Sequence, residues 1–197
     1  MAIIVVVKTT QHVSNLVEWS WRLATARGEG LTVLAVSSGT NRDLEDIDTF
    51  GEPDETESEV VKLLIETARP FAVIGRDDPD VPPLIVRRVQ RANPLDAVLG
   101  EIVRTTPSLA IVPGRWATEE EDRTLAQQIF KRAVGTVMVV TGVANELPRR
   151  ILVPSALGRN TSEALKTAHS LAGAIDGEVT IFNVVSTSME HGEEVGQ

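Results

Sequence analysis

The stretch ILVPSALGRNTSEALKTAHSLAGAIDGEVTIFNVV, residues 151–185, contains the pattern that decides the fold. Two short runs rich in branched apolar residues flank a segment in which apolar residues recur three and four positions apart. The short runs are typical of buried strands and the middle segment of an amphipathic helix. Residues 151–185 therefore predict a strand, a helix and a second, parallel strand, which together form the building unit of α/β domains.

The same pattern occurs at the N-terminus of the chain. Residues 3–37 align with residues 151–185 at a constant offset of 148 positions, without a gap. The aligned pairs include Ser14 with Ser162, Leu23 with Leu171, Ala24 with Ala172, Ala26 with Ala174 and Thr32 with Thr180. Any two such units share a hydrophobic pattern, but the identical Ser, Leu-Ala and Thr positions favour internal duplication.

Between these two stretches, predicted strands alternate with predicted helices. The expected strands are residues 3–7, 31–36, 84–89, 109–112 and 136–140. The expected helices follow a cap at Ser14, span about 57–69, begin at Asn93-Pro94, and follow the acidic run 118–122. Residues 41–59 carry nine Asp or Glu residues and predict a solvated loop that leads into the second helix. This order predicts a doubly wound, five-stranded parallel sheet covered on both faces.

The helical spacing also predicts which side chains face the core. For the third helix the expected inward residues are Leu95, Val98, Leu99, Ile102 and Val103. For the fourth helix they are Leu125, Ile129, Phe130 and Ala133.

The pattern divides the chain into a complete domain, residues 1–142, a linker, residues 143–150, and an incomplete second domain, residues 151–197, that contains only one βαβ unit. Two parallel strands and one helix leave an apolar face and open sheet edges, which are not stable alone. We therefore expect the chain to be cut from a longer tandem protein. The alternatives are completion of the second domain by another chain and exchange of this unit within a homodimer.

Composition excludes several classes of function. Hydrophobic residues make up 42% of the 197 residues, which is enough for a substantial core. The net charge of −9 argues against nucleic acid as a partner. No cysteine, no run of about 20 apolar residues and no signal peptide is present, so we expect a cytoplasmic location without direct membrane insertion. No metal-ligand spacing or nucleophile–base set is visible, so neither a metal site nor catalytic residues are predicted, and we expect no enzyme.

Several segments resemble the universal stress protein family. Residues 151–185 resemble its first βαβ unit, RANPLDAVLGEIV (91–103) the segment after its third strand, LAIVPG (109–114) its fourth strand, and AQQIFKRAVGTVMVV (126–140) its last helix and strand. The resemblance implies a flavodoxin-like α/β sandwich and dimerisation through the last strand. It also implies that tandem copies occur, alone or attached to transporters and kinases.

The chain departs from the family pattern where its members bind ATP. Those members carry an Asp shortly after the first strand, where this chain has Lys8 in the first copy and Ala156 in the second. They also carry Gly-x-x-Gly, nine residues, and Gly-Ser or Gly-Thr, whereas this chain has GRWATEEEDRTLAQQ from Gly114. Glycines let backbone N–H groups approach phosphates, and an acidic run repels them. The first copy thus resembles a member that does not bind ATP.

Two groups of residues are weak candidates for anion or nucleotide contacts. Lys8 and Thr9 end the first strand, and Gly114 and Arg115 follow the fourth, at the edge where open α/β sheets hold ligands. Ser155, Gly158 and Arg159 form a polar turn before a helix N-terminus. A solvated lysine and simple helix capping explain the same residues without a ligand.

The sequence favours a non-catalytic regulatory or interaction module of the universal stress protein type, without a cofactor. We expect a homodimer or a protein partner, and the chain as the cytosolic part of a longer protein such as a transporter. The alternative is a stress-response protein that binds ATP or another adenine nucleotide and has at most weak ATPase activity.

Overall fold

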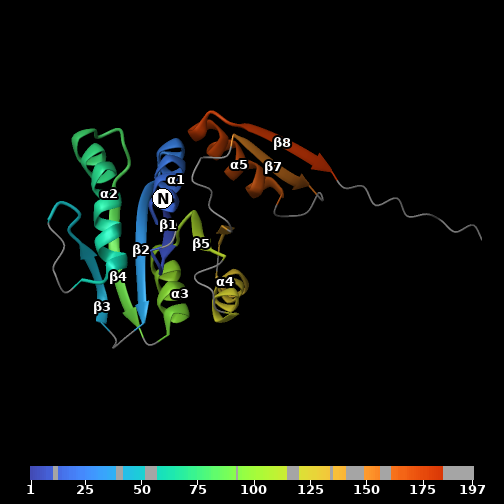
Figure 1. Cartoon of the computed structure of the whole chain (residues 1–197). Coiled ribbons are helices and arrows are strands. Elements are labelled where there is room, and N and C mark those ends of the chain that lie inside the picture. Colours follow the sequence, from blue (N-terminus) through green and yellow to red (C-terminus); the bar gives the residue numbers. More distant parts are fainter. Residues whose placement is uncertain are drawn as a thin grey trace, which may run out of the picture.

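A computed structural model describes residues 1–10, 13–38, 42–51, 57–91, 93–114, 120–133, 135–140, 149–155 and 161–183 (Figure 1). The helices are α1 (Val13–Arg27), α2 (Glu59–Asp77), α3 (Pro94–Thr105), α4 (Glu120–Arg132) and α5 (Thr161–Ile175). The strands are β1 (Ala2–Val7), β2 (Gly30–Ser38), β3 (Arg42–Ile47), β4 (Leu84–Arg91), β5 (Leu109–Pro113), β6 (Val137–Val140), β7 (Arg150–Ser155) and β8 (Glu178–Asn183).

The main sheet has six strands in the order β3-β4-β2-β1-β5-β6, and β7 and β8 form a separate sheet of two strands. Every pairing in the main sheet is parallel except that between β3 and β4. Helices α1 and α2 cover one face of the main sheet, and α3 and α4 cover the other (Figure 1). The predicted α/β fold with a doubly wound parallel sheet is confirmed.

Strand β1 lies in the middle of this sheet and is buried on both sides. Ile3 and Val5 pack in the cluster under α1 and α2, whereas Ile4 and Val6 pack in the cluster under α3 and α4. All four side chains have 0% exposure. Because alternate residues of a strand point to opposite faces, a continuous run of Ile and Val supplies both halves of the core at once.

The sheet contains one strand that the sequence pattern did not predict. Residues 42–47, expected to lie in a solvated acidic loop, form β3, an edge strand that pairs antiparallel with β4. The prediction of strict strand–helix alternation is therefore wrong at this point, and the sheet has six strands rather than five.

Ion pairs across the two strands explain why an acidic segment forms β3. In the strand register Glu45 lies opposite Arg88 and Asp46 opposite Arg87, and each facing pair forms a salt bridge. Arg88 also donates to Glu57, 2.6 Å away. The hydrogen bond to Glu45, opposed by partial burial and reinforced by Glu57, raises the pKa of Arg88 above its ordinary value. Opposite charges at facing positions stabilise a strand pair. The acidic sequence of β3 alone does not indicate this stabilisation, because the arginines belong to another strand.

Arg87 connects β3 to the core on the α3 side. Its guanidinium lies 2.6 Å from Asp46 and 3.0 Å from Glu101, whose side chain is only 4% exposed. Arg104, one turn further along α3, also pairs with Glu101. Glu101 is thus a buried carboxylate that depends on two arginines for its charge balance.

We predict that Arg87→Met lowers the free energy of unfolding by about 2–4 kcal/mol, because it leaves the buried Glu101 carboxylate with Arg104 as its only ionic partner. Urea unfolding followed by circular dichroism measures the change. The matched control Lys166→Met removes an exposed pair and is expected to leave the free energy of unfolding nearly unchanged. In the double variant Arg87→Met/Glu101→Gln the losses should be less than additive; full additivity would contradict the coupling.

Helix α2 is longer than the sequence predicted. It begins after the cap Ser58, whose hydroxyl accepts from the Val61 amide, and continues through Pro70 to Asp77. Proline removes one helical hydrogen bond, but the packing of the two residues that follow it compensates for this loss. Phe71 stacks on Trp21 of α1 with ring centroids 4.7 Å apart, and Ala72 is buried.

Three further side-chain predictions are wrong. Val103 is 66% exposed and Phe130 is 60% exposed, although both had been assigned to the core. Their neighbours on the same helices, Glu101 and Ala126, are buried instead, because the sheet contacts a narrower stripe than the apolar pattern suggests. Ser14 does not cap α1 but lies inside it, with its hydroxyl 3.3 Å from that of Thr67 on α2. Leu125 is among the residues whose side chains are not described.

The C-terminal unit β7-α5-β8 has the same local structure as β1-α1-β2. A shift of 148 residues brings the bounds of β1 and α1 onto those of β7 and α5 and the start of β2 onto that of β8, and the strand register is the same. The left-handed residue after each helix coincides as well: Gly28 has φ 62° and Asp176 has φ 52°. The hydrogen bond from the Glu29 N–H to the Ala24 carbonyl corresponds to that from the Gly177 N–H to the Ala172 carbonyl, and both are 2.9 Å long. The predicted linker lies almost wholly outside the described residues.

Helix α5 sets the position of β7-α5-β8 relative to the first domain. Helix α5 packs against α1, and Leu171 of α5 contacts the core cluster under α1 and α2 (Figure 1). The outer surface of one repeat helix thus serves as the support for the other.

Candidate functional site

The first group of candidate residues meets at the carboxyl edge of the main sheet. Lys8 and Thr9 directly follow β1, and Gly114 directly follows β5. Strands β1 and β5 are parallel neighbours, with Ile3 opposite Leu109. The fold therefore brings these residues to one edge, which is where ligands bind in open α/β sheets.

The turn after β5 is already engaged in the sheet. Gly114 is buried, and its N–H donates to the carbonyl of Val140 at 2.6 Å. This amide is therefore not directed at the space beyond the strand ends, where a phosphate would lie. Arg115, its neighbour in the candidate group, lies outside the described residues.

The second group belongs to a different sheet. Ser155 is the last residue of β7, which pairs only with β8 among the described strands. Gly158, Arg159 and the position of the missing family aspartate, Ala156, lie outside the described residues. The described members of the two groups therefore lie at the ends of separate sheets.

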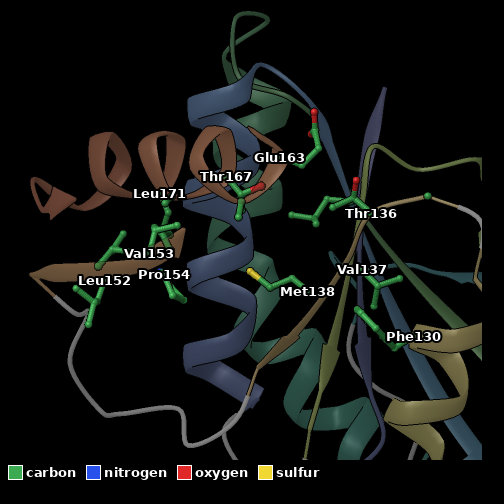
Figure 2. A pocket seen from close by; sticks show the side chains of 15 residues that line it. Phe130, Thr136, Val137, Met138, Leu152, Val153, Pro154, Glu163, Thr167 and Leu171 are labelled. Atoms are coloured by element: carbon green, nitrogen blue, oxygen red, sulfur yellow. The ribbon is translucent and has the colours of Figure 1, made fainter. Parts of the chain in front are cut away.

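A groove that the sequence did not predict lies between the first domain and β7-α5-β8 (Figure 2). Its volume is about 640 Å³, within the range of roughly 300–1,000 Å³ typical of small-molecule sites. The first domain contributes Leu109, Phe130, Gly135, Thr136, Val137 and Met138. The second contributes Ile151, Leu152, Val153, Pro154, Glu163, Ala164, Thr167, Ala168 and Leu171.

The groove is apolar with a polar end. Figure 2 shows Thr136, Thr167 and Glu163 toward one end, and Met138 directed into the space between the units. Such a lining accepts apolar side chains or an apolar molecule better than a phosphate. Because it joins residues of two separate segments, 109–138 and 151–171, no local motif predicts it. The one indication of the groove in the sequence was Phe130, an apolar residue at the edge of the apolar stripe of α4.

Glu163 is the only acidic residue that lines the groove among the described side chains. Its carboxylate accepts a hydrogen bond from Lys166 at 2.7 Å, one helical turn away. This hydrogen bond, together with the charges of Lys166 and, more weakly, Arg27, lowers the pKa of Glu163 below its ordinary value. The groove therefore carries a paired carboxylate at its polar end rather than a proton donor.

We predict that Lys166→Met returns the pKa of Glu163 toward that of an ordinary glutamate. A lowered pKa stabilises the fold above the unfolded-state pKa, and this contribution disappears as the pH falls through the lowered value. Carboxyl-carbon NMR titration of both proteins measures the two midpoints. Ser170→Ala, one turn beyond, is the control, and an equal midpoint in wild type and Lys166→Met would contradict the assignment.

Two further classes of site are absent from the part of the chain that the structure describes. No group of three or more His, Asp or Glu side chains is arranged to hold a metal ion there. Over the same ranges, every helix is too short or too polar to span a lipid bilayer.

No protein-family model and no curated protein matches the chain. In structure it is similar to the universal stress protein from Archaeoglobus fulgidus in complex with dAMP, at 16% identity and a TM-score of 0.45, over 71% of this chain and 96% of that one. It is similar to a universal stress protein in complex with cAMP, at 11% and 0.43, over 72% and 96%. It is also similar to the universal stress protein UspA from Lactobacillus plantarum, at 10% and 0.41, over 71% and 97%. The structure is thus similar to several universal stress proteins.

Proposed function

We propose that the chain is a non-catalytic regulatory or interaction module of the universal stress protein type. One observation carries this proposal: several large apolar side chains on the last elements of the chain are exposed to solvent. They are Phe130 on α4, Val139 on β6, Leu152 on β7, and Ile181 and Phe182 on β8, with exposures between 40% and 62%. Leu152 and Phe182 share one face of the β7–β8 sheet, and exposed apolar surface of this kind is typical of sites that bind other proteins.

The partner that we propose for the edge of β6 is a second copy of the chain. Strand β6 pairs with β5 only, so in the described structure its other edge has no strand beside it. An unpaired edge offers backbone donors and acceptors to another strand, and a two-fold axis allows two β6 strands to pair with each other. Val139, 40% exposed, lies on this strand and would be covered by such pairing.

We predict that the protein sediments as a dimer at micromolar concentration and that Val139→Asp weakens the dimer at least tenfold, because a charge then lies at the paired edge. Sedimentation velocity over a dilution series measures the dissociation constant. The matched control Val103→Asp changes an exposed valine on α3 and should leave the dimer intact. A monomer at about 100 µM wild type, or equal dissociation by both variants, contradicts the proposal.

The same proposal includes a cytoplasmic location and attachment to a longer protein such as a transporter. The location rests on the composition of the sequence, and the attachment rests on the family resemblance. Whether the natural reading frame continues beyond Gln197 into a second complete domain or a membrane region is the observation that tests the attachment.

The alternative is binding of ATP or another adenine nucleotide at the carboxyl edge of the main sheet. The meeting of Lys8 and Thr9 with the turn at Gly114 favours it, since a lysine at such an edge supplies a positive charge to a phosphate. The engaged Gly114 amide argues against it, because the close backbone contact that a phosphate requires is missing there.

Calorimetric titration with ATP, ADP, AMP and cyclic AMP separates the two functions. We expect no saturable binding below about 1 mM, because the first copy lacks both the family aspartate and the phosphate-binding glycines. Micromolar binding that Lys8→Ala weakens at least tenfold would establish the alternative. Thr10→Ala, an exposed neighbour beyond Thr9, serves as the matched control.

A further inference from the structure

The groove between the first domain and β7-α5-β8 has an apolar body. Val137 and Met138 of β6 line it on one side, and Val153 of β7 and Leu171 of α5 line it on the other (Figure 2). Met138 and Leu171 also pack against the core cluster under α1 and α2, so these two lining side chains belong to the packed interior. The body of the groove therefore favours an apolar group and disfavours a charged one, which would lose its hydration there.

Three side chains that carry oxygen lie at one end of this body. Thr136 immediately precedes β6, and Glu163 and Thr167 lie four residues apart on α5, so that they share one face of the helix. Figure 2 shows their oxygen atoms toward the same end of the groove. A threonine hydroxyl can donate or accept a hydrogen bond, whereas an ionised carboxylate only accepts. This end of the groove therefore calls for a donor on the molecule that occupies it.

The charges near this end favour a neutral donor. Lys166 donates to Oε1 of Glu163 at 2.7 Å, and Arg27 adds a weaker attraction to the same carboxylate. Glu163 is therefore already balanced and needs no further cation. An anion would meet the Glu163 carboxylate, since neither Lys166 nor Arg27 is among the described residues that line the groove. A carboxylate accepts several hydrogen bonds, so an O–H or N–H group can donate to it beside Lys166.

We propose that this groove binds a small neutral molecule that has an apolar ring-sized body and a hydroxyl or N–H group at one end. The body lies between β6 and β7, and the hydroxyl or N–H group donates to Glu163. The volume of about 640 Å³ is that of a small-molecule site. Such a molecule contacts both the first domain and β7-α5-β8, so its binding stabilises the packing of one on the other.

The inference goes beyond the proposed function and does not depend on a second copy of the chain. Val139, the residue assigned above to the dimer, is not among the described residues that line the groove. Val139→Asp, which is expected to separate the dimer, should therefore leave binding in the groove unchanged.

Three naphthalene compounds that differ only in one substituent serve as probes. β-Naphthol carries a neutral donor, β-naphthyl methyl ether has the same oxygen without a donor, and β-naphthoate carries a negative charge. Calorimetric titration of the whole chain with each compound gives the three dissociation constants. Because the ring is the same in all three, the differences report on the polar end of the groove.

We expect β-naphthol to bind with a dissociation constant of about 100 µM or lower, and the ether and the naphthoate to bind at least tenfold more weakly. Glu163→Gln keeps an acceptor but removes the negative charge and leaves Lys166 unpaired. This variant should bind β-naphthoate at least threefold more tightly than the wild type does, which narrows the preference for β-naphthol. A purely structural role of Glu163 would not change the order of the probes.

A variant that fills the groove locates the binding site. Ala164 is exposed on α5 and lines the groove, so Ala164→Trp places a large side chain in it and should weaken β-naphthol binding at least tenfold. The matched control Ala26→Trp changes an exposed alanine on α1 that is not among the described lining residues, and it should leave binding intact. Circular dichroism verifies that both variants are folded.

Three results overturn the proposal. The first is the absence of saturable β-naphthol binding by about 1 mM. The second is equal weakening, or none, by Ala164→Trp and Ala26→Trp, which places the probe elsewhere. The third is equal affinity for the three probes, which shows that the polar end does not select a neutral donor.

Discussion

The burial of β1 on both faces is the constraint on which the rest of the structure depends. Five consecutive apolar side chains, 0–2% exposed, must be covered from two sides, and the strand is paired on both edges. Burial of each Ile or Val of this kind contributes about 1.5–3 kcal/mol, so helices on both faces are required rather than optional. The placement of α1 and α2 on one side and of α3 and α4 on the other follows from this strand, as does the meeting of Lys8 with Gly114 at its carboxyl end.

Ion pairs hold β3 on β4, at the edge of the sheet that lies beyond the apolar core. At the β4 edge, Arg87 and Arg88 point to opposite faces, and each meets a carboxylate of β3 and one from elsewhere in the fold. The acidic segment is therefore held by neighbours 31 to 43 positions away in the chain. Such a strand needs no apolar alternation of its own, because facing arginines stabilise it and only Ile47, at its end, is described as packing against the core.

The two βαβ units show that equal local structure does not give equal surroundings. Their helices and first strands have the same lengths, and the strand register and the position of the left-handed residue after the helix coincide. Yet the positions of Ile4 and Leu34 are fully buried in the first unit, whereas those of Leu152 and Phe182 are exposed in the second. The difference arises because α3 and α4 cover one face of the first sheet, while α5 is the only described helix that packs on the second. The apolar surface and the groove beside β7 both result from this difference.

Local patterns along the chain were sufficient for the five parallel strands, the helices between them and the start of α3 at Asn93-Pro94, because period, capping residues and proline position act within a few residues. The same patterns located Lys8, Thr9 and Gly114 at strand ends. They did not show that the Gly114 amide is taken by Val140, that Phe130 is exposed, or that β3 exists. Each of these depends on which residues from distant segments lie opposite one another. Only the tertiary structure decides that, since contacts across strands and between units have no counterpart in the order of neighbouring residues.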